Sequence, residues 1–148
     1  LACVETLLAF KLRNANVNLI SSPDFTSGKS IIIHKDRIHI ERILLNLISN
    51  AIDAYAEGDF DDNQKNIEVI CEGTDRQVSL KVIDFGCGIS DENMSKLFTP
   101  FFTTKAGECG SGIGLVTTKD IVESELDGEI KIVSKVGAGT TITITFTD

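Results

Sequence analysis

Residues 84–115 read DFGCGISDENMSKLFTPFFTTKAGECGSGIGL, and this order of residue types decides how the rest of the chain is interpreted. An acidic residue stands in a glycine-rich turn, an aromatic segment follows, and alternating glycines then lead into a helical apolar pattern. Gly86 and Gly88 come after a β-branched run that ends at Ile83, so we expect Asp84 where a strand ends and the backbone turns sharply. A carboxylate held there can accept a hydrogen bond from an exocyclic amine.

The second glycine group, Gly110, Gly112 and Gly114, precedes a stretch in which apolar residues recur at helical spacing, residues 115–126. Backbone N–H groups at a helix N-terminus favour an anion such as phosphate. The aromatic segment between the two groups, residues 98–102, is too apolar to lie free in water, which indicates a loop that docks on something. Glycines at this spacing are also typical of turns and helix caps, but the order of the three parts predicts a nucleotide site with a movable cover.

A third pattern lies upstream, in residues 37–56, where apolar side chains at helical spacing predict a stripe that faces a core. Asn46, Asn50 and Asp53 stand at i, i+4 and i+7 and share one face beside that stripe. Asn is a middling helix former, so two of them one turn apart indicate a role other than helix stability. The amides form a polar edge, bond to neighbouring backbone, or bind a hard cation; magnesium prefers such oxygens and takes its other ligands from water and phosphates.

Five segments together resemble the ATP-binding catalytic domain of sensor histidine kinases, which belongs to the superfamily of DNA gyrase, heat-shock chaperone ATPases and mismatch-repair ATPases. They are similar to the N box, first glycine box, F box, second glycine box and closing Gly-Thr motif of that domain. The sequence PFFTTK at residues 100–105 resembles the corresponding segment of the nitrogen-regulatory and dicarboxylate-sensing branch of these kinases. In order, the segments are NLISNAIDA (46–54), DFGCG (84–88), LFTPFFTTK (97–105), GSGIGL (110–115) and VGAGTT (136–141).

The resemblance implies ATP and Mg²⁺ as cofactors and assigns a role to each matching residue. Asn50 would be the magnesium ligand, Asn46 would help to place the phosphates and the metal, and Lys105 would reach the polyphosphate. Asp84 would read the adenine amine, and Thr140 would complete the contact with the base. The remaining residues that the resemblance places at the cofactor are Asp53, Gly86, Gly88, Phe98 in the hinge of the ATP lid, and Gly110, Gly112, Gly114 and Leu115 around the phosphates.

One position separates the branches of the superfamily. Hydrolysing members carry a Glu where this chain has Asn46, and an amide is a poor base for activating water. We therefore expect little self-sufficient ATP hydrolysis. We expect instead that the γ-phosphoryl group is transferred to an acceptor, and that catalysis of this transfer depends on positioning and charge neutralisation.

In the family the acceptor is a His on a separate dimerising helical hairpin. The only histidines here, His34 and His39, lack the acidic neighbour of the acceptor motif, so we expect the acceptor outside this chain. The expected function is thus that of a protein histidine kinase catalytic domain. Its partners would be the His hairpin of a homodimeric parent kinase and the receiver domain of a response regulator. The alternative is a degenerate copy that binds nucleotide or a partner domain without phosphoryl transfer.

Composition agrees with one domain, residues 1–148, without the His hairpin or a sensor region, and monomeric when isolated. The formal net charge of −8 argues against nucleic acid as a partner, because phosphate neutralisation needs clustered Lys and Arg. No apolar run approaches eighteen residues and no signal peptide is visible, so we expect a cytoplasmic domain, with a membrane anchor elsewhere in the parent left open. Four cysteines without CxxC spacing indicate reduced thiols.

The pattern along the chain predicts the α/β class: a two-layer α/β sandwich whose mixed, mostly antiparallel sheet is covered on one face by helices, with an ATP lid loop. In the last predicted strand, apolar residues alternate strictly with threonine, which puts Ile142, Ile144 and Phe146 on one face. Asp36 is a plausible N-cap of the second helix. The predicted helices are 2–13, 37–56, 91–97 behind Ser90, and 113–126, and the predicted strands are 16–22, 30–34, 66–72, 77–84, 129–135 and 140–146.

Overall fold

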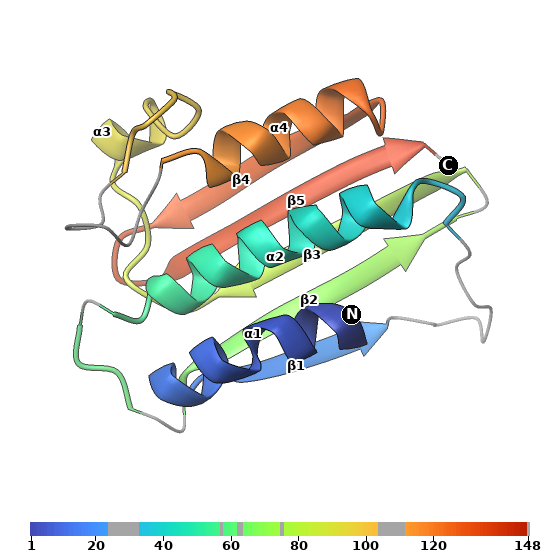
Figure 1. The fold of residues 1–148 in the computed structure, drawn as a ribbon. Helices are drawn as coiled ribbons and strands as arrows, with labels where there is room; N and C mark the ends of the chain where they lie inside the picture. Colours follow the sequence, from blue (N-terminus) through green and yellow to red (C-terminus); the bar gives the residue numbers. More distant parts are fainter. Residues whose placement is uncertain (24–32, 57, 62–63, 75, 104–111, 148) are drawn as a thin grey trace.

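The structure of the protein is a computed structural model, and Figure 1 shows its fold. Helices and strands alternate along the chain with two hairpins, as the α/β prediction requires. The structure describes residues 1–23, 33–56, 58–61, 64–74, 76–103 and 112–147. Over these residues the element order is α1 (Ala2–Ala15), β1 (Asn18–Pro23), α2 (Arg37–Asp53), β2 (Asn66–Gly73), β3 (Gln77–Asp84), α3 (Asp91–Met94), α4 (Gly114–Ser124), β4 (Gly128–Lys135) and β5 (Gly139–Thr147).

The strands form one sheet in the order β1-β2-β3-β5-β4, in which β1 pairs with β2 in parallel and the other neighbours pair antiparallel. The predicted mixed, mostly antiparallel sheet is therefore confirmed. Residues on the inner face alternate with residues on the outer face, as the pleat requires. On β5 the inner-face residues Ile142, Ile144 and Phe146 are buried, and they lie opposite Val82, Leu80 and Val78 of β3.

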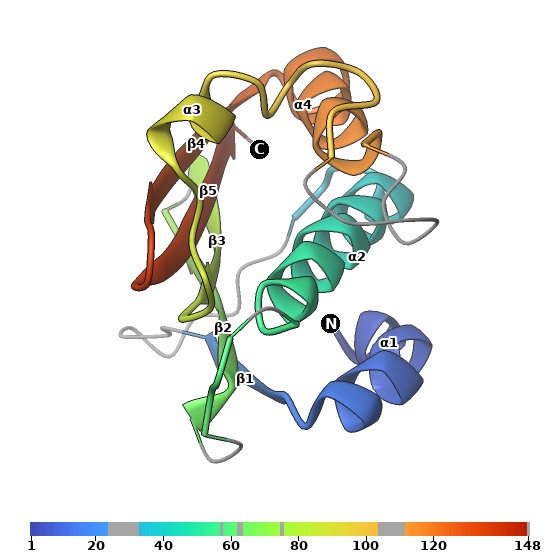
Figure 2. The same ribbon diagram turned by 90° about the vertical axis from the view of Figure 1, so that its left-hand side faces the viewer.

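Helices α1, α2 and α4 lie in a second layer against one face of the sheet (Figure 2), and no other described element covers the opposite face. The central helix, α2, buries its apolar stripe between the sheet and the flanking helices, with Ile43 and Ile48 fully inaccessible. This is the two-layer sandwich that the sequence predicts. None of the described helices combines the length and the apolarity that crossing a membrane would need.

Two helix starts follow the predicted capping chemistry. The Asp36 carboxylate accepts a hydrogen bond from the N–H of Ile38 at 2.9 Å at the start of α2. At the start of α3 the Ser90 hydroxyl accepts from the N–H of Asn93 at 3.3 Å. Each cap satisfies an N–H group that has no partner within its helix.

Helix ends differ from the sequence-based boundaries, and the reasons are local. The first helix continues beyond residue 13 to Ala15, because Asn16 adopts a left-handed conformation (φ 52°) that ends it, and β1 begins only at Asn18. The second ends at Asp53 because the N–H groups of Tyr55 and Ala56 bond to carbonyls three residues back instead of four. The helix expected over 91–97 keeps one turn, and the one expected over 113–126 is two residues shorter at its C-terminal end. Of the strand expected over 30–34, residues 30–32 lie outside the described residues, and Ile33 and His34 are not in a strand.

Candidate functional site

Asn46, the first amide of the predicted pair, faces the start of α4. Its Nδ2 donates to the carbonyl oxygen of Gly114 at 3.3 Å and to the hydroxyl of Thr118 at 3.4 Å. Thr118 is completely buried, and its hydroxyl donates to the same Gly114 carbonyl at 2.9 Å. With Nδ2 engaged, Oδ1 is the Asn46 atom that can bind a cation or a water molecule. These bonds join α2 to the second glycine segment, GSGIGL at residues 110–115, through Gly114.

The C-terminal end of α2 contacts the first glycine segment, DFGCG at residues 84–88. Ala54, which ends the helix, accepts a hydrogen bond from the N–H of Cys87 at 2.9 Å. A Cβ on Gly86 would collide with the same Ala54 carbonyl, so only glycine fits there. Asn46 and Ala54 are two turns apart, about 12 Å along the helix axis, and the half-buried Asn50 lies between them, on the same face as Asn46. Helix α2 therefore bridges the two glycine segments, with the predicted magnesium ligand midway.

Asp84 ends β3 on the helix-covered side and is only 7% exposed. Burial raises the pKa of its carboxyl from 3.8 to about 6, although the backbone N–H groups of Gly86 and Thr140 oppose that rise. The Gly86 N–H donates to Asp84 Oδ1 at 3.0 Å. A carboxyl so shielded from water can accept a hydrogen bond from a donor that enters the site, such as an amine.

Two glycines allow the backbone to close around Asp84. Gly139 has φ 97°, and a Cβ there would strike the carbonyl of Asp84. Gly88 has φ 72°, and its Cβ would strike the carbonyl of Lys135. Both conformations are left-handed, which side chains other than glycine rarely adopt. The first glycine segment thus packs against the β4–β5 hairpin on one side and against α2 on the other.

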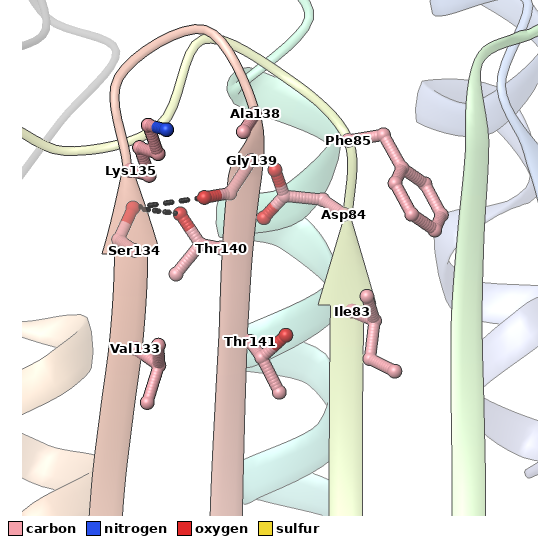
Figure 3. A pocket seen from close by; sticks show the side chains of 10 residues that line it. All are labelled: Ile83, Asp84, Phe85, Val133, Ser134, Lys135, Ala138, Gly139, Thr140 and Thr141. Atoms are coloured by element: carbon pink, nitrogen blue, oxygen red, sulfur yellow. Dashed lines mark hydrogen bonds between the residues drawn. The ribbon is translucent and has the colours of Figure 1, made fainter.

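Thr140 lies opposite Asp84 in the β3–β5 ladder and is 7% exposed. Its hydroxyl is 2.9 Å from Ser134 Oγ, which also donates to the carbonyl of Gly139 at 3.0 Å (Figure 3). The same Ser134 oxygen accepts from the N–H of Ile89 at 2.8 Å. Ser134 therefore holds both the predicted adenine contact and the end of the first glycine segment.

A hollow lies at the same end of the sheet, where the end of β3 meets the β4–β5 hairpin, and Figure 3 shows it with α2 behind the strands. Side chains of Ile83, Thr141 and Val133 line it in register across β3, β5 and β4. Asp84 and Thr140, the two predicted contacts to the base, also line this hollow.

The aromatic segment returns to the second glycine segment. The N–H of Phe101 donates to the carbonyl of Gly112 at 3.1 Å, and both residues have left-handed backbones (φ 64° each). The Phe98 ring packs under the ammonium of Lys119 on α4, 4.9 Å from ring centroid to Nζ. Leu115 lies half-buried in the first turn of α4. The two ends of the predicted lid therefore meet beside α4, while Lys105 and Gly110 lie outside the described residues.

Asp53 is turned toward α1. Its carboxylate forms a salt bridge with the ammonium of Lys11, which also donates to the carbonyl of Ser49 at 3.2 Å and to its hydroxyl at 2.7 Å. These bonds tie α1 to the C-terminal half of α2. A direct role of Asp53 at a cofactor remains a prediction.

Comparison with known proteins places this geometry in a family. Residues 35–148 match the family described as "Histidine kinase-, DNA gyrase B-, and HSP90-like ATPase". The chain belongs to this family. The match includes all five segments singled out in the sequence, so the predicted resemblance is confirmed.

Relatives in this ATPase family include sensor kinases. The chain is 33% identical over 134 residues to sporulation kinase D of Bacillus subtilis (90% of the chain, 24% of that protein). It is 40% identical over 109 residues to the C4-dicarboxylate transport sensor protein DctB of Rhizobium meliloti (74% and 16%), and 37% identical over 121 residues to the sensor histidine kinase ZraS of Salmonella typhimurium (81% and 24%). The chain thus spans less than a quarter of the length of these relatives.

Solved structures in the family have the same fold. The nucleotide-free catalytic domain of histidine kinase ThkA superposes with a TM-score of 0.76 at 28% identity, over 97% of this chain and 88% of that one. The histidine kinase AdeS of Acinetobacter baumannii gives 0.74 at 25% identity, over 99% and 61%. The fold class and the histidine-kinase type of this ATPase domain are therefore established.

Two residues near the site escaped the sequence analysis. Half-buried and exposed residues alternate along β4, and Ser134 is one of the half-buried ones on the inner side. Strand periodicity was therefore the signal that could have found it. Tyr55 lies just beyond the predicted metal-binding pattern and carried no such signal. Only the structure shows that Tyr55 lies where the end of α2 contacts the first glycine segment.

The side chains present fit the nucleotide that the ATPase family implies. Asp84 offers an acceptor for an amine, and α4 begins without an acidic residue in its first turn or a side-chain cap from the described residues, which favours an anion. Within the described ranges, no three His, Cys, Asp or Glu side chains gather into a metal site. The amide oxygens of Asn50 and Asn46 are of the kind that a hard cation prefers, and such a cation would complete its shell with phosphate and water.

Proposed function

We propose that this chain binds ATP with Mg²⁺ between the two glycine segments and donates the γ-phosphoryl group to a His on a separate dimerising hairpin. The observation that carries the proposal is the bridge formed by α2, which contacts Gly114 through Asn46 and Cys87 through Ala54. In this reading Asp84 and Thr140 hold the base, Asn50 holds the cation, and the start of α4 receives phosphate. Lys105 and Gly110 complete the polyphosphate side.

The proposal favours transfer to a protein acceptor over hydrolysis. Asn46 is an amide whose nitrogen is already engaged by Gly114 and Thr118, so it does not remove a proton from water. What the chain supplies is position and a charge-neutralising cation. The attacking nitrogen of the acceptor His forms the new bond to phosphorus, and ADP leaves.

The wider setting follows from the relatives, which are named as sensors and kinases. We propose that the chain is one catalytic domain, monomeric by itself, of a homodimeric two-component sensor kinase. The parent's phosphorylated His would pass its phosphoryl group to the receiver domain of a response regulator. The domain would act in the cytoplasm.

The test is to mix this chain with a separately produced His hairpin, labelled ATP and Mg²⁺. We expect label on the hairpin with the wild type and very little release of inorganic phosphate without the hairpin. Asn50→Ala should abolish magnesium-dependent binding and labelling, whereas the control Asn18→Ala, an exposed amide on β1, should change neither.

A second candidate function is a degenerate module that binds nucleotide without transfer. It would be supported by magnesium-dependent ATP binding without hairpin labelling, under conditions in which an intact kinase labels its own hairpin. Rapid phosphate release by the isolated chain would instead indicate a hydrolase and contradict the role assigned to Asn46.

A further inference from the structure

Tyr55 occupies the junction between α2 and the first glycine segment. It is 5% exposed, and its ring meets the ring of Phe60 edge-on, with centroids 5.2 Å apart and planes at 85°. Its hydroxyl donates to the carbonyl of Asn66 at 2.6 Å and accepts from the N–H of Phe85 at 2.9 Å. Burial is the main reason that its pKa lies above 10.0, so the phenol stays neutral and serves as donor and acceptor at once.

The Phe85 N–H is the first of three consecutive backbone donors after β3, each with a different acceptor. Phe85 donates to the Tyr55 hydroxyl, Gly86 to the carboxylate of Asp84, and Cys87 to the carbonyl of Ala54. Two of the three acceptors, Ala54 and Tyr55, lie in the turn directly after α2. The Asp84 carboxylate accepts from the N–H groups of Gly86 and Thr140, and the Gly86 donor lies between the two donors that are bonded to Tyr55 and Ala54.

We propose that Tyr55 is a positioning residue for base recognition: by holding the Phe85 N–H against β2 it keeps Asp84 where it accepts an exocyclic amine and disfavours an oxo group. This inference rests on the proposed function. A site that offers one rigid acceptor discriminates strongly against a base that presents another acceptor at that point, whereas a site that can shift does not. Tyr55 would therefore set the preference for adenine over guanine nucleotides rather than the strength of phosphate binding.

The test variant is Tyr55→Phe, which keeps the ring and its contact with Phe60 and removes only the hydroxyl. We expect ATP binding to weaken by about tenfold, because the Phe85 N–H loses its partner. GTP binding should change little, so the ratio of the two affinities should fall by about the same factor. Magnesium dependence should remain, since Asn50 and the start of α4 are untouched.

The matched control is Phe60→Leu, which removes the ring-edge contact and leaves the hydroxyl bonds in place. It should lower the melting temperature without changing the ratio of ATP to GTP affinity. A purely structural role for Tyr55 predicts that both variants lower stability and that both keep the wild-type ratio, and that result would overturn the proposal.

Amide hydrogen exchange gives a readout that needs neither variant nor nucleotide. Although Phe85 is 47% exposed, its amide should exchange slowly in the free wild-type chain, because it is bonded to a buried hydroxyl. Fast exchange at Phe85 in the wild type would refute the positioning role. A wild type that binds neither ATP nor GTP would remove the proposed function together with this inference, whereas a selective wild type with an equally selective Tyr55→Phe would remove this inference alone.

Discussion

Among single residues, Asp84 has the most perturbed chemistry in the site. Its carboxyl has a pKa of about 6 in the folded protein against 3.8 as a reference, mainly because burial disfavours the charged form. Since the folded state holds this proton more tightly than the unfolded chain, stability falls as pH rises from about 4 to about 6. The difference of about 2.2 pKa units corresponds to at most about 3 kcal/mol lost at neutral pH. The domain thus gives up stability to keep a carboxylate in the site.

Asp84→Asn tests that cost, because an amide is never charged and can still accept the Gly86 N–H. At pH 4 the wild-type carboxyl is mostly protonated in the folded protein and therefore neutral, like the amide. We expect only a small difference in stability between the variant and the wild type at that pH. Between pH 4 and pH 7 the variant should gain up to about 3 kcal/mol over the wild type. Urea denaturation at a series of pH values measures this gain, and a difference that does not vary with pH would contradict the raised pKa.

At the scale of elements, the β4–β5 hairpin decides how closely the strands approach the first glycine segment. Gly137 and Gly139 both have left-handed backbones in this turn, at φ 76° and φ 97°. A Cβ on Gly137 would meet nothing within 4 Å, whereas one on Gly139 would collide with the end of β3 at Asp84. The two glycines share a conformational requirement and differ only in crowding.

Alanine at each position separates these two requirements. Gly137→Ala should cost about 1–2 kcal/mol, the penalty for a left-handed alanine. Gly139→Ala should cost at least about 3 kcal/mol, because β5 must also move away from β3. Chemical denaturation of both variants gives the comparison. Equal losses in the free energy of unfolding would mean that the close approach of β5 to Asp84 adds nothing to the cost of the substitution at Gly139.

At the scale of the whole molecule, the candidate site is assembled from α2, the end of β3, the start of β5 and the start of α4. Asn46 bonds to Gly114, and Asp84 pairs with Thr140. A ligand that binds this assembly binds only the folded chain, so it stabilises every part of it. Hydrogen bonds also link the flanking helices to α2, since Lys11 of α1 bonds to Ser49 and Asn46 bonds to Gly114 of α4.

Magnesium and ATP together at about 100 times the dissociation constant should add roughly 2.7 kcal/mol of stability. For a domain of this size that corresponds to a rise in melting temperature of roughly 5–10 °C. ATP with a chelator should give a smaller rise, and Asn50→Ala should make the two conditions equal. A wild-type shift that the chelator leaves unchanged would argue against Asn50 as a metal ligand.

Periodicity and capping chemistry predicted most of the fold because they are local. The alternation in β5 and the stripe in α2 each require only that one face be buried, and the Asp36 and Ser90 caps require only the next helical turn. Helix ends were less predictable. The left-handed turn at Asn16 and the tightened turn after Asp53 depend on where the chain must go next, which neighbouring residues do not encode.

The candidate site divides in the same way. The sequence by itself determined the family, the amide pair on α2, the acidic residue in a glycine turn and the amide in place of a base at position 46, because these are residue types at fixed spacings. Only the tertiary structure decided that α2 bridges the two glycine segments, that Asp53 turns to Lys11, and that Tyr55 and Ser134 hold the backbone around Asp84. The physical reason is that hydrogen bonds between segments far apart in the chain depend on packing, and no local pattern records which distant donor will meet which acceptor.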